Sequence, residues 1–301
     1  MKDKTIFDVI IIGGSYSGLS AAMALGRALR KVLIIDSGKP CNKQTPHSHN
    51  LLTQDGNSPA EISALAKKQV LKYDTVSFYD GFASKAKQEN DGFSVSITSG
   101  EIFKAKKLIL ATGLKDTFPD ISGFSECWGI SILHCPYCHG YEVRNQKTGI
   151  LANGEMAFEL AILISNWTKQ LTIFTNGRAN LTSEQSAKLE EHNIKVHEKL
   201  ILQVNHSHGY VDDIEFVDGS KVSVKAIYAR PAMQQNSEIP KELGCEIVET
   251  GLLKTDAFQK TSVAGVYACG DNAAMRSLAV AISTGTLAGV VANKELIFEN
   301  F

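Results

Sequence analysis

The feature that most constrains the fold is a strand, a glycine-rich turn, a helix and a second strand near the start of the chain. Residues 8–12 (DVIII) form a continuous apolar run, as in a parallel strand buried on both faces. The turn GGSYSG (13–18) follows, an Ala- and Leu-rich helix is predicted over 19–29, and a strand over 32–35 leads to Asp36. This order predicts a Rossmann-like dinucleotide-binding unit.

The spacing of this turn, Gly13-x-Ser15-x-x-Gly18, is suited to a pyrophosphate. Such turns bring backbone amides, here including that of Gly14, and a helix N-terminus close to the phosphates. Ser15 replaces the middle glycine and is small enough for close approach. Asp36 ends the second strand, where an acidic side chain can hold ribose hydroxyls. These residues are the first candidates for cofactor binding.

A second strand–helix–strand pattern begins at Thr148, with a strand predicted over 149–152, a helix over 156–165 and a strand over 171–174. Its turn, ANGEMA (152–157), keeps one glycine. Glu155 would place a negative charge facing the phosphates that such a turn attracts. The stretch FTNGR after the second strand has one arginine and no cluster to hold a 2′-phosphate. A structural domain that has lost tight nicotinamide binding therefore stays an open alternative.

The order of the remaining elements predicts how the domains are connected. Strands are expected over 93–97 and 107–110, the latter leading into Ala-Thr-Gly. A hairpin is expected with strands over 214–217 and 222–228 and with Asp218-Gly219 at its turn. A strand over 265–268 and a small-residue helix over 278–293 end the chain. We predict an α/β protein whose second nucleotide-binding domain is inserted into the first. The expected domains are residues 1–115 with 237–301, and residues 116–236.

Cys135 and Cys138 form the one closely spaced pair among six cysteines. Cys-x-x-Cys spacing lets the two sulfurs bond, and it favours a lowered thiolate pKa when a cation or helix N-terminus is near. The adjoining His134 and His139 could exchange protons with the thiols. Zinc is the main alternative, but zinc sites usually combine two separated pairs, and no second pair exists. We predict a redox dithiol rather than a metal site or a structural disulfide.

Composition excludes several other functions. Net charge is −1, and the chain has no basic tract, so no nucleic-acid partner is expected. It lacks an apolar stretch of about 18 residues, so no membrane span is expected, and residues 1–14 do not resemble a signal peptide. These features predict a cytoplasmic protein. The four scattered cysteines are expected to be small buried hydrophobes, namely Cys41, Cys127, Cys245 and Cys269.

Taken together, the motifs resemble low-molecular-weight thioredoxin reductases over essentially the whole chain. They are the FAD-type turn, Ala-Thr-Gly, Cys-x-x-Cys in an inserted domain, Gly-Asp and an Arg-led terminal helix. More narrowly, GGSYSGLSAAMALGRALR, GKPCNKQTPHSHN and CPYCHGYE resemble the branch with gliotoxin- and holomycin-type dithiol oxidases and bacterial thioredoxin reductase-like proteins. The resemblance implies two Rossmann-like, three-layer ββα domains, bound FAD and a homodimer.

The resemblance also implies roles for individual residues. The glycine turn would line the FAD pyrophosphate, Asp36 would bind the adenosine ribose, and Asn50 would lie near the flavin. Asp271 would bind the ribityl chain, and a helix N-terminus at the flavin would stabilise negative charge there. The further FAD-binding residues implied in this way are Thr112, Gly113, Gly270, Arg276, Ser277 and Leu278.

The same resemblance gives the two cysteines different roles. Cys138 would be the sulfur next to the flavin, and Cys135 would attack the substrate disulfide. His139 stands where thioredoxin reductases carry an Asp that donates a proton, so it would take the acid/base role. For His134, and for His47 and His49, structural or FAD-lining roles are expected rather than catalysis.

Three functions are compatible with these features. A thioredoxin reductase-like enzyme would pass electrons from NADPH or NADH through FAD and the dithiol to a thioredoxin-like protein or a small-molecule disulfide. A dithiol oxidase would pass electrons from a substrate dithiol through FAD to oxygen. A non-catalytic FAD protein would use the dithiol as a redox sensor. The degraded second glycine motif and the missing His-Arg-Arg…Arg clamp of the family weaken the expectation of NADPH use.

Overall fold

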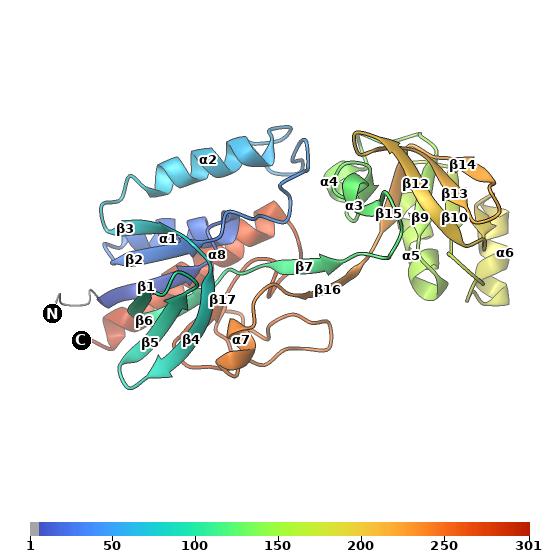
Figure 1. The fold of residues 1–301 in the computed structure, drawn as a ribbon. Helices are drawn as coiled ribbons and strands as arrows, with labels where there is room; N and C mark the ends of the chain where they lie inside the picture. Colours follow the sequence, from blue (N-terminus) through green and yellow to red (C-terminus); the bar gives the residue numbers. More distant parts are fainter. Residues whose placement is uncertain (1–5) are drawn as a thin grey trace. The chain divides into compact units, whose positions relative to one another are not determined.

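The computed structural model describes residues 6–301 and has the α/β fold with parallel sheets that the sequence predicts (Figure 1). The chain divides into two compact units. The first takes in the chain up to Lys43 together with Ala60–Lys115 and Met233–Phe301, and the second comprises Gln44–Pro59 and Asp116–Ala232. Residues 1–5, part of the stretch considered as a signal peptide, lie outside the described residues.

The segment 44–59 groups with the second unit, whereas the sequence placed it in the first domain. The Gln44 side-chain amide donates to the carbonyl oxygens of Ser125 (3.1 Å) and Trp128. Gly129 lies so close to this segment that a Cβ added to it would be 2.8 Å from the Thr45 hydroxyl. These contacts join residues about 80 positions apart, so the local sequence pattern could not predict them.

The first unit is built on a seven-stranded sheet with strand order β3-β2-β1-β6-β5-β4, in which β17 also pairs with β6. The pairs β3–β2, β2–β1, β1–β6 and β6–β17 are parallel, and β4–β5 and β5–β6 are antiparallel. The strands are β1 (Ile6–Ile12), β2 (Val32–Asp36), β3 (Val76–Asp80), β4 (Ala83–Glu89), β5 (Gly92–Ile97), β6 (Ile102–Leu110) and β17 (Val266–Ala268).

Side chains alternate across this sheet and form a core on each face. Val9 and Ile11 pack with helices α1 (Tyr16–Arg27) and α8 (Leu278–Phe298), whereas Ile10 and Ile12 pack toward β4, β5 and the segment around α7 (Ile239–Glu242). The helix α2 (Pro59–Val70) completes this unit. Gly285 lets α8 approach α1, because a Cβ added there would lie 2.1 Å from the Ser17 carbonyl oxygen.

The second unit contains a parallel five-stranded sheet of order β11-β10-β9-β15-β8 and a separate three-stranded meander, β12-β13-β14. Its sheet strands are β8 (Ile132–Leu133), β9 (Thr148–Leu151), β10 (Leu171–Phe174), β11 (Lys195–His197) and β15 (Ala226–Ala229). The meander strands are β12 (Ile201–Ser207), β13 (Tyr210–Phe216) and β14 (Lys221–Ser223). The helices are α3 (Phe124–Cys127), α4 (Pro136–His139), α5 (Gly154–Ile164) and α6 (Ser183–Glu191).

The predicted strand over 222–228 is wrong as a single element. Its first part is β14, which pairs antiparallel with β13 around Asp218-Gly219, and its second part is β15, which runs parallel to β9 and β8. Between them, the Lys225 amide donates to the Lys147 carbonyl (2.7 Å), so the chain leaves one sheet for the other.

The chain passes between the units along β7 (Leu114–Thr117) and returns along β16 (Ala232–Gln235), and these two strands pair with each other. None of the helices formed by residues 6–301 has the length and apolarity needed to cross a membrane.

Candidate functional site

Four neighbouring strands of the first unit end at the predicted nucleotide site. Gly13 follows β1, Asp36 ends β2, Thr112 comes shortly after β6, and Gly270 comes shortly after β17. These strands run parallel and adjacent, so their carboxyl ends lie at one edge of the sheet. The fold therefore brings together four residues that are up to 257 positions apart, where parallel α/β sheets bind nucleotides.

The glycine turn leaves no room for side chains. Gly13 has φ +108°, and a Cβ there would lie 2.1 Å from the Ala111 carbonyl oxygen; a Cβ on Gly18 would lie 1.9 Å from the Gly13 oxygen. Ser15 is the N-cap of α1 but makes no side-chain cap hydrogen bond within the described chain, and the first turn carries no acidic residue. The helix N-terminus therefore presents amide groups that suit a bound pyrophosphate.

Asp36 is oriented by the turn that it faces. Its Oδ1 accepts a hydrogen bond from the Gly14 amide (3.0 Å), and its Oδ2 accepts one from the Gly38 amide (3.2 Å). A Cβ on Gly14 would lie 2.8 Å from the Asp36 Cβ, so glycine is required for this approach. The carboxylate is half-buried and retains lone pairs that can accept from ribose hydroxyls.

Asn272 joins two parts of this site, and the sequence analysis missed it. The side chain is fully buried, and its amide donates to the Leu110 carbonyl (3.0 Å) and the Thr112 hydroxyl (3.1 Å). Its Oδ1 has no hydrogen-bond partner within residues 6–301. A polar residue two positions after Gly270, just beyond a buried strand, was the available signal. Asn272 thus fixes the segment that carries Asp271 to the one that leads into Gly113.

The start of α8 completes the nucleotide residues. Arg276 precedes the helix, with its Nε 3.6 Å from Asp271 Oδ2, while Ser277 is the N-cap and Leu278 the first helical residue. No acidic residue occupies the first turn of α8. The glycine turn, Asp36 and this second uncapped helix start fit a dinucleotide such as FAD. The residues Gly13, Gly14, Ser15, Gly18, Asp36, Thr112, Gly113, Gly270, Asp271, Arg276, Ser277 and Leu278 all lie in this unit.

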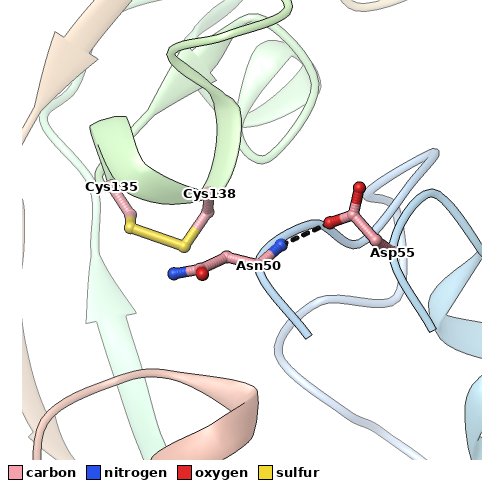
Figure 2. The surroundings of a disulfide bond; sticks show 4 residues. All are labelled: Asn50, Asp55, Cys135 and Cys138. Atoms are coloured by element: carbon pink, nitrogen blue, oxygen red, sulfur yellow. Dashed lines mark hydrogen bonds between the residues drawn. A yellow bond between two sulfur atoms is a disulfide. The ribbon is translucent and has the colours of Figure 1, made fainter. Parts of the chain in front are cut away.

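Cys135 and Cys138 are joined as a disulfide in the second unit, with 5.4 Å between their Cα atoms (Figure 2). Cys135 immediately precedes α4, whose first residue is Pro136. Trp167 supports this turn: its Nε1 would lie 2.8 Å from a Cβ on Gly140, and its ring packs edge-on against Tyr137 at 5.4 Å. Cys135 and Cys138 are both half-buried residues, so part of each is accessible to solvent.

Cys135 and Cys138 are bonded to each other, whereas a zinc site would need their sulfurs as thiolates. Within residues 6–301, no group of three or more His, Cys, Asp or Glu side chains is arranged to hold a metal ion. Of the other cysteines, Cys127, Cys245 and Cys269 are buried as predicted, and burial raises the pKa of each thiol, that of Cys127 to about 11. The prediction for Cys41 is wrong: it is exposed in the loop after β2, 3.9 Å from Asp271 Oδ2.

His139 has the properties of a neutral acid/base group. Its pKa lies below the ordinary value of 6.5, because burial disfavours the charged form and the His49 charge opposes protonation, whereas Glu142 acts in the opposite direction. The rings of His49 and His139 are perpendicular, with centroids 6.5 Å apart. His139 is therefore available to accept a proton near neutral pH.

Asn50 lies in the second unit, with the dithiol, and not among the nucleotide residues of the first unit. Figure 2 shows its side chain pointing toward the disulfide. Its backbone has φ +60°, and its amide donates to Asp55 Oδ1 (2.7 Å). His49 lies in the same region, and the sequence predicted for it a structural or FAD-lining role. Its partners Asp55 and Glu142 were not predicted, because the contact between His49 and Glu142 joins residues about 90 positions apart.

The N-terminus of α5 differs from that of α1. The Asn153 Oδ1 accepts hydrogen bonds from the amides of Gly154 and Asn180, both at 2.8 Å. Glu155 occupies the first turn, and its carboxylate accepts from the Gln185 side-chain amide (2.6 Å). This helix start is therefore already capped and negatively charged, which disfavours a phosphate there.

Comparisons with known proteins agree with this geometry. A family model described as pyridine nucleotide-disulphide oxidoreductase matches residues 7–285. The thioredoxin reductase tcpT of Claviceps purpurea is 34% identical and aligns over 99% of this chain and 96% of its own. An oxidoreductase structure from Agrobacterium tumefaciens is similar with TM-score 0.91 at 37% identity, covering 98% and 99% of the two chains. A putative thioredoxin reductase from Bacillus anthracis gives 0.94 at 29% identity, covering 98% and 100%.

Proposed function

Because the chain belongs to the pyridine nucleotide-disulphide oxidoreductase family, we propose that Cys135 and Cys138 are the redox pair that exchanges electrons with a disulfide or dithiol substrate. The chain is an FAD-dependent oxidoreductase of the thioredoxin reductase type, and this family uses FAD and NAD(P)H. The observation that carries the proposal is the half-buried disulfide beside a neutral histidine.

The nucleotide residues of the first unit would hold the FAD, which when bound accepts or supplies the electron pair of the reaction. The α1 N-terminus and glycine turn would bind its pyrophosphate, and Asp36 its ribose. Asp271 and the start of α8, from Arg276, would contact the part nearest the flavin ring. The resemblance to thioredoxin reductases supports this assignment, and the same resemblance assigns Cys138 to the flavin side and Cys135 to the substrate side.

Exchange at the dithiol requires proton transfer. When the dithiol reduces a substrate disulfide, the Cys135 thiol loses its proton to His139 and attacks one substrate sulfur, and the other sulfur leaves. The Cys138 thiol then attacks the mixed disulfide, which closes the Cys135–Cys138 bond and releases the second sulfur. Two protons and two electrons pass from the enzyme to two substrate thiols, and oxidation of a substrate dithiol is the reverse.

A specific observation favours a second candidate, a dithiol oxidase that delivers electrons to oxygen. The capped and acidic start of α5, with Asn153 and Glu155, is poorly suited to a nicotinamide dinucleotide. The first candidate takes electrons from NADPH or NADH and reduces a thioredoxin-like protein or a small-molecule disulfide; the second oxidises a small-molecule dithiol. A homodimer in the cytoplasm is proposed for both, on the resemblance alone.

One anaerobic experiment separates the candidates. The FAD-loaded protein is mixed with NADPH, with NADH or with a dithiol while flavin absorbance is followed. Bleaching by a nicotinamide supports the reductase, and bleaching by dithiol alone, with peroxide formed on readmitting air, supports the oxidase. Bleaching by none of them overturns both.

The roles of the two sulfurs have their own test. Cys138→Ser is expected to abolish any thiolate–flavin charge-transfer absorbance, and Cys135→Ser to retain it. The opposite pattern would reverse the assignment.

A further inference from the structure

His49 is held between two carboxylates in the second unit. Its Nδ1 lies 3.6 Å from Asp55 Oδ2, and its Nε2 lies 3.6 Å from Glu142 Oε1. Both ring nitrogens of His49 therefore face a carboxylate oxygen. The side chain is only 20% exposed, so the ring has little freedom to turn.

Asp55 links this clamp to Asn50. Its Oδ1 accepts from the Asn50 amide at 2.7 Å, while its Oδ2 faces His49. The Asp55 carboxylate therefore contacts both the ring of His49 and the backbone of Asn50. The Asn50 side chain points toward the disulfide (Figure 2). Glu142 closes the clamp from the other side, three residues after His139 along the chain.

The charged and titratable groups around the two histidines are few. His139 faces His49 and Glu142. His49 faces Asp55 and Glu142, and the His47 ring lies 6.5 Å from it. The buried Tyr228 hydroxyl is near enough to Glu142 for that charge to contribute to its raised pKa. A cation at His49 opposes protonation of His139, and the Glu142 carboxylate favours it.

We propose that His49 is a positioning residue for the dithiol reaction: held between Asp55 and Glu142, its ring orients the imidazole of His139, and a positive charge on His49 opposes protonation of that imidazole. This inference rests on the proposed function, in which His139 takes the proton of the attacking thiol. The balance of the two opposite charges, at His49 and Glu142, then sets the lowest pH at which exchange is fast.

A merely structural His49 would tie its loop to the turn after α4 without affecting the protonation of His139. The two roles differ in their pH signature. Replacement of a structural residue lowers the rate equally at all pH values. Replacement of a charged positioning residue moves the acidic limb of the pH–rate profile, because it changes the pH at which His139 becomes neutral.

The test uses the full-length, FAD-loaded protein, reduced anaerobically with dithiothreitol, freed of excess reductant and mixed with the disulfide probe DTNB across a pH series. The dithiol and DTNB give the enzyme disulfide, two thionitrobenzoate anions and two protons. We expect His49→Gln to slow this burst on the order of tenfold and to move its acidic limb to higher pH. Glu142→Gln, which keeps an acceptor for His49, moves the limb to lower pH.

Further variants make the test decisive. His49→Lys places a cation between the carboxylates and is expected to keep the wild-type limb, and His49→Asn is the second neutral variant if His49→Gln fails to fold. His139→Gln removes the limb itself. His208→Gln, an exposed imidazole in the β12–β13 turn, leaves the burst unchanged.

The outcomes separate the inference from the function on which it rests. An unmoved limb in His49→Gln, or shifts in the same direction for His49→Gln and Glu142→Gln, overturns the inference. Absence of any burst in the wild-type protein instead overturns the proposed redox role of Cys135 and Cys138.

Discussion

At the scale of single residues, the nucleotide turn depends on positions where not even one carbon atom can be added. Gly18 approaches the Gly13 carbonyl so closely that its missing Cβ would overlap the oxygen. The turn is therefore fixed by backbone packing, and Ser15 stands in it without a cap hydrogen bond of its own. Gly18 is required for the turn to form, whereas the identity of residue 15 affects only how closely a phosphate can approach.

This difference predicts opposite results for two substitutions in one turn. Gly18→Ala is expected to weaken FAD binding by about tenfold or more, because the added methyl group displaces the Gly13 backbone. Ser15→Gly, the matched change that removes atoms, should retain FAD. The ratio of flavin to protein absorbance after dialysis measures both. Equal FAD content in the two variants would contradict a phosphate site at this turn.

The residues that could be predicted are those that their spacing in the sequence identifies. Cys135 and Cys138 lie three residues apart, and Asp36 ends a recognisable strand. The contacts of Asn272 and His49 could not be predicted this way, because their partners are brought near only by the fold. Asp55 shows the limit most clearly, since its carboxylate connects to Glu142 through His49 across 87 residues of sequence.

At the scale of elements, an ionic network around the buried Lys107 anchors the C-terminal part of α8 to the sheet. Lys107 on β6 is 7% exposed and pairs with Glu295 (3.5 Å) and Glu299. Glu295 also accepts from Lys260 (2.5 Å) and from the Tyr267 hydroxyl of β17. Burial raises the pKa of Glu295, but the hydrogen bonds from Lys260 and Tyr267 and the two lysine charges outweigh it, so the pKa is lowered.

Loss of this carboxylate is expected to destabilise the fold. Glu295→Gln should lower the free energy of unfolding by about 2 kcal/mol at pH 7, because it leaves Lys107 buried with less compensation. A lowered folded-state pKa means that the contribution is full above the ordinary value of 4.5 and is lost as the pH falls through the folded value. Urea unfolding at pH 7 and in acid measures this difference. Glu89→Gln, at a more exposed pair with Lys104, is the control, and an equal loss there would contradict the argument.

How well a strand could be predicted from the sequence depends on how it is buried. The parallel strands β1, β2 and β10 are mostly apolar, and each was predicted close to its observed bounds. In the meander, the hairpin turn at Asp218-Gly219 was predicted correctly, but β12 was missed, because a strand with one polar face gives a weaker pattern. The run over 222–228 was misassigned since local alternation cannot show that β14 and β15 join different sheets.

At the scale of the whole molecule, the family match and the two-domain α/β architecture confirm the resemblance to thioredoxin reductases. The first unit supplies a nucleotide site with open helix starts, and the second carries the disulfide. The second unit repeats the strand–helix–strand plan with a different helix start, capped by Asn153 and charged by Glu155. The molecule thus has one helix start that fits a dinucleotide phosphate and one altered version of it, and in the proposed function the source of electrons depends on the second.

Removing the negative charge of Glu155 is expected to strengthen the binding of a nicotinamide dinucleotide. Glu155→Gln keeps an acceptor for Gln185 but removes the negative charge from the first turn of α5, so the helix N-terminus attracts phosphate more strongly. The NADPH concentration that gives half-maximal anaerobic flavin bleaching should fall about two- to fivefold. Glu184→Gln, which removes a first-turn charge from α6 of the same unit, should leave it unchanged. If both variants behave like wild type, Glu155 does not limit nicotinamide binding, and a preference for dithiol as electron donor must have another cause.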